Sequence, residues 1–249
     1  MCAKQVPGPE PPPRLDAVTH RLVREGPAVL DEADATGIET ALGLGAAEVV
    51  LVSMAPGGEM AGVRQGLALG ASAAVVVSDP ALAGADALAT ARALAAAVRR
   101  VGRADLVIAG TVSVDGYAGV LASQLAELLE LPALTFARRV TLEGGLLRAE
   151  RETEEGHDEV ECPLPCVLSV MTGSAPARYP SYKAIVDARR KPVEVVGLAD
   201  LGLGAPAVGQ EVLSVTPAPA APRGASEVVD DGGHGHERIL DLLVRLKVV

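Results

Sequence analysis

Aromatic residues are almost absent from this sequence, which has no Trp, one Phe and three Tyr among 249 residues. Proteins that bind single-stranded nucleic acid stack its bases on aromatic side chains, and this chain lacks such platforms. Positive charge is also scarce, because 32 acidic residues outweigh 22 basic ones and give a formal net charge of −10. A protein that neutralises a phosphate backbone needs the opposite balance. We therefore expect no nucleic-acid partner.

Cysteine is rare as well, and Cys2, Cys162 and Cys166 are the only three. An odd number of cysteines, in a chain with enough apolar residues for a large core, argues against a secreted fold held by disulfides. No basic residues followed by an apolar run stand at the start, so no signal peptide is predicted. The Ala-rich stretch 82–101 carries one Asp and three Arg, which is typical of a core helix and not of a membrane span. We expect a cytoplasmic protein without membrane insertion.

The common catalytic signatures are missing too. The sequence contains no G-x-S-x-G elbow, no G-x-x-x-x-G-K-[ST] phosphate loop and no H-E-x-x-H zinc motif. Its four histidines lie in polar or loop contexts, away from the ends of predicted parallel strands. Cys162-Pro-Leu-Pro-Cys166 has the form of a metal half-site, but no second ligand pair matches it, so structural thiols are the favoured interpretation. We predict no metal site and no catalytic residue.

The abundant residues, Ala, Val and Leu, form alternating strand and helix patterns. Apolar runs predict buried strands at 48–54, 73–78 and 105–109, and apolar residues spaced by three and four predict helices between and after them. Alternation of this kind implies right-handed βαβ units. The predicted fold is α/β, with a doubly wound, mostly parallel Rossmann-like sheet.

Beyond Pro132 the pattern changes to shorter strand-like pieces separated by turns. These pieces cover 133–142, 146–152, 160–161 and 166–171. We expect them to be antiparallel strands added to the parallel sheet. A short helix at 182–190 and a last strand at 193–196 are predicted to follow.

The chain is expected to divide into an α/β domain, residues 1–203, and an arm, residues 204–249. The arm is rich in Pro, Ala and Gly and is predicted to be flexible. It ends in an amphipathic helix, whose apolar stripe comprises Ile239, Leu242, Leu243 and Leu246. Such a helix folds back on its own domain or docks on another chain, and the residues alone favour neither.

The most informative stretch is the loop that follows the predicted strand at 105–109. It carries three glycines, two hydroxyl residues and one carboxylate: Gly110, Gly116, Gly119, Thr111, Ser113 and Asp115. Glycines let a phosphate approach the backbone closely, and a helix starting near 116–119 would point its N–H groups at the anion. Asp115 would then accept a hydrogen bond from a ribose hydroxyl, or it caps the helix. Taken alone, the loop favours the cap over the nucleotide site.

A second concentration of informative residues lies at 177–191. Two of the three tyrosines, Tyr179 and Tyr182, fall here beside Arg178 and Lys183. Aromatic and Arg residues on an exposed turn are typical of an interface anchor. The alternative is a simple helix start, with Pro180 and Ser181 as its signals.

Taken in order, these residues resemble the beta subunits of electron transfer flavoproteins. The matching stretches are Lys4–Pro7, Leu67–Ala71, the loop 105–119 with its Asp115-Gly116, Glu150–Glu152, Leu164-Pro165 and 178–191. The likeness extends to about Leu203, and the arm with its terminal helix also fits. No single stretch is specific, but several in the correct order and spacing are.

The resemblance implies the beta subunit of an alpha/beta heterodimer, which is an electron carrier and not an enzyme. Such carriers take electrons from flavin dehydrogenases, such as the acyl-CoA dehydrogenases of fatty acid oxidation, and pass them to the respiratory chain through a quinone oxidoreductase. The family holds FAD mainly in the alpha subunit. Its beta subunit binds AMP, or a second FAD in electron-bifurcating members. Because the flavin transfers the electrons, the missing catalytic signatures are expected.

The resemblance also implies site residues. Carried over onto this sequence, nucleotide binding falls to Cys2, Asp31, Asp34, Met54, Gly110, Thr111, Ser113, Asp115, Gly116, Gly119, Val120 and Leu121. Partner binding falls to the family's recognition loop, here Arg178, Tyr179, Tyr182, Lys183 and Ile185. In that loop, an apolar residue at the position of Tyr182 plugs into the dehydrogenase.

Two other functions are alternatives. Asp31-Glu-Ala-Asp34 stands where the family often has Asn-Pro, and the first strand is short, so a nucleotide-binding sensor or scaffold that has lost electron transfer is one alternative. An adenylate-using enzyme of similar fold is the other. Residues 7–13, however, lack the His-x-Gly-His and Ser-Gly-Gly-x-Asp-Ser loops of such enzymes.

Overall fold

The computed structural model describes residues 1–9, 14–207, 209, 212–216 and 232–248. The chain divides into two compact units, Met1–Leu213 and Ser214–Val249. The first unit contains the α/β fold, and the second contains the expected terminal helix, α6 (Gly235–Arg245). The Pro-rich part of the predicted arm, at 217–222, lies outside the described residues.

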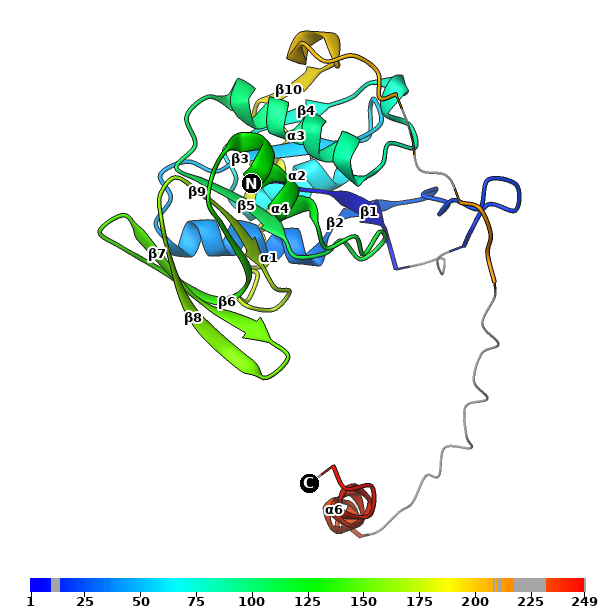
Figure 1. Cartoon of the computed structure of the whole chain (residues 1–249), viewed down its shortest axis with the longest axis vertical. Helices are drawn as coiled ribbons and strands as arrows, with labels where there is room; N and C mark the ends of the chain where they lie inside the picture. Colours follow the sequence, from blue (N-terminus) through cyan, green and yellow to red (C-terminus); the bar gives the residue numbers. More distant parts are fainter. Residues whose placement is uncertain (10–13, 208, 210–211, 217–231, 249) are drawn as a thin grey trace. The chain divides into compact units, whose positions relative to one another are not determined.

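The first unit is built around parallel strands in two groups (Figure 1). One group has the order β10 (Val193–Val196), β4 (Ala73–Val77), β3 (Val50–Met54). The other has the order β5 (Leu106–Gly110), β9 (Cys166–Val170), β6 (Ala133–Glu143). The apolar runs of β3, β4, β5 and β9 are typical of strands that are buried on both faces. The doubly wound α/β prediction is confirmed.

The first residues of the chain lie between these two groups of strands. Cys2 forms an isolated parallel bridge with Val52 of β3, and its N–H donates to the carbonyl of Ile108 in β5 at 2.8 Å. The amino group of Met1 donates to the carbonyl of Val50, also at 2.8 Å. This N-terminal segment therefore joins β3 to β5 across a gap that no other described strand fills.

An antiparallel extension follows the parallel strands, as expected. β6 pairs with β7 (Leu146–Thr153), and β7 pairs with β8 (Gly156–Pro163). The prediction that 166–171 is also antiparallel is wrong, because β9 lies between β5 and β6 and runs parallel to both. An apolar run marks a buried strand but does not specify the direction of its neighbours. β8 is longer than the predicted 160–161, since its exposed polar residues also pair with β7 at the sheet edge.

Helices cover both faces of the parallel strands. Those of the first unit are α1 (Glu32–Gly43), α2 (Ala61–Leu69), α3 (Ala87–Val101), α4 (Leu121–Leu129) and α5 (Tyr182–Ala188), with 3-10 turns at Pro80–Leu82 and Ala199–Leu201. α1, α2 and α5 pack into an apolar cluster that includes Ile38 and Leu67. α3 and α4 pack into a second cluster around Leu94 and Leu125. Helices on both faces are the arrangement that the alternating pattern predicts.

Hydrophobic periodicity does not predict α1 or the short antiparallel pair β1 (Gln5–Pro7) and β2 (Ala28–Leu30). The buried face of α1 consists largely of small and polar residues, so no apolar stripe marks it. One of them is Gly37, where an added Cβ would lie 2.4 Å from Cε of Met1. The small face of α1 therefore allows the helix to pack closely against the N-terminal segment.

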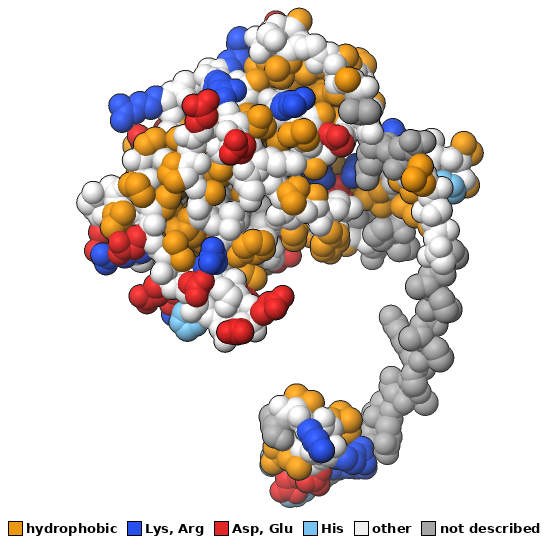
Figure 2. All heavy atoms as spheres, in the orientation of Figure 1, with side chains coloured by type: hydrophobic (Ala, Val, Ile, Leu, Met, Phe, Trp, Pro, Cys, Tyr) orange, Lys and Arg blue, Asp and Glu red, His pale blue; other side chains and the backbone are white. Residues whose placement is uncertain are grey.

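The surface of the first unit carries both charge signs. On the face seen in Figure 2, acidic and basic side chains are interspersed, with no continuous basic patch among the described residues. Ion pairs such as Arg100–Glu194 and Arg151–Asp158 contribute to this mixture. Among the residues that the structure describes, none of the helices has the length and apolar character to cross a membrane.

Leu168 of β9 has no exposed surface, because β9 lies inside the sheet and α1 and α4 both pack near it. Leu168→Ala should lower the free energy of unfolding by about 2–5 kcal/mol, through lost apolar burial and a residual cavity. Leu88→Ala in α3 is the control, since that side chain is 41% exposed, and its loss should stay near about 1 kcal/mol. Urea unfolding followed by circular dichroism measures both. Equal losses would contradict the central position of β9.

Candidate functional site

Parallel strands β3, β5 and β9 end at one edge of the sheet, where open α/β folds place their ligands. The loop that joins β5 to α4, residues 111–120, begins at this edge. Its first residue is fixed to the sheet, because both the backbone N–H and the hydroxyl of Thr111 donate to the carbonyl of Val170 at 3.0 Å. Most residues predicted to bind nucleotide lie on or beside this β5–α4 loop.

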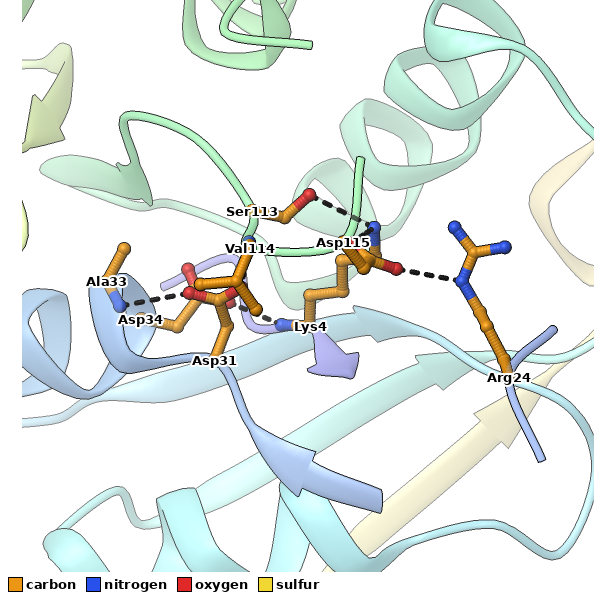
Figure 3. Close-up of polar contacts among 8 residues, drawn as sticks. All are labelled: Lys4, Arg24, Asp31, Ala33, Asp34, Ser113, Val114 and Asp115. Atoms are coloured by element: carbon orange, nitrogen blue, oxygen red, sulfur yellow. Dashed lines mark hydrogen bonds and ion pairs between the residues drawn. The ribbon is translucent and has the colours of Figure 1, made fainter. Parts of the chain in front are cut away.

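Two buried carboxylates connect the start of α1 to the loop (Figure 3). Asp31 caps α1, and its second oxygen accepts from the N–H of Val114 at 2.8 Å. Asp34 accepts from the N–H of Lys4 at 2.6 Å and from the N–H of Gly110 at 3.3 Å. Buried N–H groups without acceptors are costly, so these bonds hold helix, loop and N-terminal segment together.

Asp34 has an unusual protonation equilibrium. Burial raises its pKa to about 7, opposed by the hydrogen bond from Lys4 and assisted by the charge of Asp31. Near neutral pH the Asp34 carboxyl is therefore protonated for a large part of the time. Its repulsion of a bound anion is correspondingly reduced.

Asp115 is held between two cations (Figure 3). Its side chain is 3% exposed; one oxygen accepts from Nζ of Lys4 at 2.5 Å and the other from Nε of Arg24 at 2.8 Å. Lys4 also donates to the hydroxyl of Ser113 at 3.1 Å. Burial would raise the pKa of Asp115, but the hydrogen bonds from Lys4 and Arg24 outweigh it and hold the pKa below its usual range. Asp115 is therefore a carboxylate at neutral pH.

The prediction that Asp115 caps α4 is wrong. α4 begins at Leu121, and its N-cap residue, Val120, makes no side-chain hydrogen bond to the helix. The expected helix start near 116–119 is wrong as well. Tyr117 and Gly119 have φ angles of 48° and 67°, and this left-handed backbone cannot continue a right-handed helix.

The stretch that leads into α4 has backbone N–H groups without acceptors. Within the described part of the chain, the N–H groups of Ala118, Gly119 and Val120 donate no hydrogen bond. They precede the first helical turn, which begins at Leu121 and whose own N–H groups also have no acceptor inside the helix. Free N–H groups and the helix dipole together favour an anion at such a position.

The remaining predicted nucleotide residues lie at the same edge or next to it. Cys2 is buried between β3 and β5, and burial raises the pKa of its thiol to about 11. Met54 is the last residue of β3. Lys4 and Arg24 were not predicted as site residues. Lys4 belongs to a stretch that matches the family, whereas nothing in the sequence connects Arg24 with a residue 91 positions away.

The residues predicted to bind a partner form a second group, separate from the β5–α4 loop. Tyr179 is 98% exposed, Tyr182 83% and Ile185 44%. α5 begins at Tyr182, where the hydroxyl of Ser181 accepts from the N–H of Ala184 at 3.2 Å. The helix-start interpretation is therefore correct, and it leaves the side chains available to a partner.

The cysteine pair shows no metal-binding arrangement. Within the described residues, no group of three or more His, Cys, Asp or Glu side chains is placed to hold a metal ion. Cys162 and Cys166 are buried free thiols. Burial, together with the neighbouring Cys162, raises the pKa of Cys166 to about 12. Burial therefore favours the neutral thiol over the thiolate, which is the form that acts as nucleophile and metal ligand.

Known proteins are similar to this chain over most of its length. Residues 19–201 match the family model described as the electron transfer flavoprotein domain. The chain is 37% identical over 240 residues to the electron transfer flavoprotein subunit beta of Mycobacterium bovis, covering 94% of this chain and 87% of that protein. The Mycobacterium leprae protein of that name is 36% identical over 260 residues, covering 99% of this chain and 97% of that protein. The caffeyl-CoA reductase-Etf complex subunit CarD of Acetobacterium woodii is 35% identical over 214 residues, covering 84% of this chain and 81% of that protein.

Gly110 leaves no room for a side chain. An added Cβ would lie 2.7 Å from Cβ of Ala33 and 3.0 Å from a carboxylate oxygen of Asp34. Gly110→Ala should displace the start of α1 and lower the free energy of unfolding by about 1–3 kcal/mol. Gly43→Ala, at the other end of α1 with nothing within 4 Å, is the control and should change it by at most about 1 kcal/mol. Thermal denaturation compares them, and equal Tm values would contradict this packing.

The pKa of Asp34, about 7 in the folded chain against 3.8 as the ordinary value, makes stability depend on pH. Between these pH values the folded protein binds more protons than the unfolded chain, so this group's contribution to stability falls as pH rises from about 4 to 7. Asp34→Asn cannot titrate. The stability of the wild type relative to this variant should therefore decrease with pH in urea unfolding at about pH 4.5, 6 and 7.5. A pH-independent difference would show that Asp34 is ionised throughout.

Proposed function

The chain belongs to the electron transfer flavoprotein family, among its beta subunits, and we propose that it is the beta subunit of a cytoplasmic heterodimeric electron carrier. The carrier takes electrons from flavin dehydrogenases, such as acyl-CoA dehydrogenases, and passes them to the respiratory chain through a quinone oxidoreductase. The observation that carries this proposal is the likeness to a subunit beta protein along 94% of the chain.

In this proposal the chain binds one nucleotide at the edge of the sheet, AMP in a simple carrier or a second FAD in a bifurcating complex. Cys2, Asp31, Asp34 and Met54 line it together with the β5–α4 loop. Its phosphate binds the free N–H groups of 118–120, and this assignment is supported by the uncapped start of α4. The name of the CarD relative places that protein in a caffeyl-CoA reductase-Etf complex. The nucleotide of this chain is therefore AMP or a second FAD.

The local charges fit a phosphate. Asp31 and Asp115 carry negative charge, Lys4 and Arg24 carry positive charge, and Asp34 is partly protonated at neutral pH. Carboxylates and cations therefore balance, and the N–H groups add a field that favours an anion. In a chain of net charge −10, Lys4 and Arg24 both hold Asp115 and reduce the repulsion of a phosphate.

The redox chemistry belongs to FAD, which accepts and releases the electrons and is held mainly by the alpha subunit. This chain supplies no acid, base or nucleophile to that step. Its residues bind the nucleotide, fix the loop around it and present the surfaces that partners recognise.

Partner recognition is assigned to the second group of residues. Tyr182 enters an apolar pocket of the dehydrogenase, flanked by Arg178, Tyr179, Lys183 and Ile185. This assignment is supported by the exposure of both tyrosines in a chain that has few aromatic residues. We assign α6, which carries the apolar stripe of Ile239, Leu242, Leu243 and Leu246, to docking on the alpha subunit.

A nucleotide-binding sensor or scaffold without electron transfer is the second candidate. Asp31 and Asp34 favour it, because they bring carboxylates to the nucleotide position where the family often has Asn-Pro. The two candidates differ in one outcome, the reduction of the bound flavin by a dehydrogenase.

The test starts from the heterodimer, obtained by expressing this chain together with an alpha subunit. Denaturation should release nucleotide from both subunits, identified by mass spectrometry, with the flavin content measured by absorbance. AMP with a single flavin defines a simple carrier, and two flavins define a bifurcating one. Anaerobic addition of an acyl-CoA dehydrogenase and its substrate should then bleach the flavin absorbance. A nucleotide-bearing dimer that is never reduced supports the sensor, and a stable nucleotide-free monomer overturns both candidates.

A further inference from the structure

The segment 175–188, here called the docking segment, presents the partner-binding residues. Binding orders flexible segments at an entropic cost, whereas a fixed segment avoids that cost. The contacts that hold the docking segment in place therefore affect how tightly a partner binds.

The end of the docking segment is fixed to α2 by two cations. Arg64 donates to the carbonyls of Ala188 and Lys191 at 2.8 and 2.9 Å. Lys191 in turn donates to the carbonyls of Leu67 and Ala71 at 2.8 and 2.6 Å. Four backbone carbonyls at the ends of α2 and α5 are thereby satisfied. The C-terminal end of α5 cannot move without breaking these bonds.

The beginning of the docking segment is held differently. From Ala175 to Pro180 no backbone-to-backbone hydrogen bond connects the described residues to the rest of the chain. One side-chain contact does: Nε and Nη2 of Arg178 each donate to a different oxygen of Glu39, both at 2.7 Å. Two parallel bonds between guanidinium and carboxylate fix orientation as well as distance.

Glu39 holds the docking segment and does not itself belong to the surface that meets a partner. It lies in α1, outside the docking segment, and its side chain is 19% exposed, against 52% for Arg178. The hydrogen bond from Arg178 lowers the pKa of Glu39, so the carboxylate is charged at neutral pH. An ion pair whose arginine is 52% exposed adds little to global stability. Removing it should leave the fold intact and release residues 175–180.

We propose that Glu39 is a positioning residue for partner recognition. Its paired bonds to Arg178 hold the start of the docking segment, so that Tyr179 and Tyr182 project in one fixed arrangement towards a flavin dehydrogenase. This inference rests on the proposed function and adds to it a residue that acts through Arg178, without touching the partner itself.

The test compares heterodimers that carry wild-type chain, Glu39→Gln or Glu194→Gln. The second variant breaks the Arg100–Glu194 pair, which is a similar half-exposed ion pair joining α3 to β10. An acyl-CoA dehydrogenase is assayed with each heterodimer as electron acceptor. Glu39→Gln should raise KM for the heterodimer about 5- to 20-fold with kcat nearly unchanged, because a freed segment must be ordered on binding. Glu194→Gln should leave KM unchanged.

Amide hydrogen exchange supplies a readout that does not depend on the dehydrogenase. In Glu39→Gln, the amides of Ala184 and Ile185, which donate to Ser181, should exchange faster, while those of 186–191 should not change. An unchanged KM, or unchanged exchange at Ala184 and Ile185, overturns the positioning role. If the wild-type heterodimer is not reduced at all, the proposed function fails, and faster exchange still shows that Glu39 fixes the segment.

Discussion

The arrangement of the whole first unit depends on the hydrogen bonds of its N-terminal segment. β3 and β5 are not paired with each other, and Met1–Ala3 bonds to both. The next residue, Lys4, gives its backbone N–H to Asp34 and its ammonium group to Asp115. A few consecutive residues therefore join the two groups of strands and also anchor the start of α1 and the β5–α4 loop. The same short segment therefore determines how the two groups of strands are joined and how the candidate site is arranged.

The sequence predicts features that a short window of residues determines. The strands at 50–54, 73–77 and 106–110 are continuous apolar runs, and the loop after β5 is marked by its glycines. α1 escapes prediction because its buried face is small and polar, and the direction of β9 depends on neighbours that its own residues do not specify. The ion pairs of Asp115 join it to residues 91 and 111 positions away. Such contacts arise only from tertiary structure, so the local sequence around Asp115 indicates a helix cap instead.

α1 contributes to both groups of candidate residues. Asp31 and Asp34, at its start, contact the β5–α4 loop, and Glu39, about two turns further on, holds the docking segment. Thr36, between them, accepts from the N–H of Gly173 at 3.4 Å. Because the twelve residues of α1 form one helix, a displacement at its start would also move Glu39 and with it the docking segment.

The distribution of aromatic side chains has an optical consequence. All four of them, Tyr117, Phe136, Tyr179 and Tyr182, are exposed, so no aromatic ring lies in the interior. Without Trp, the near-ultraviolet absorption and intrinsic fluorescence of the chain come from tyrosines that already face solvent. Those signals therefore depend little on the packing of the core. They change instead when a bound partner covers the tyrosines, so they can be used to detect binding.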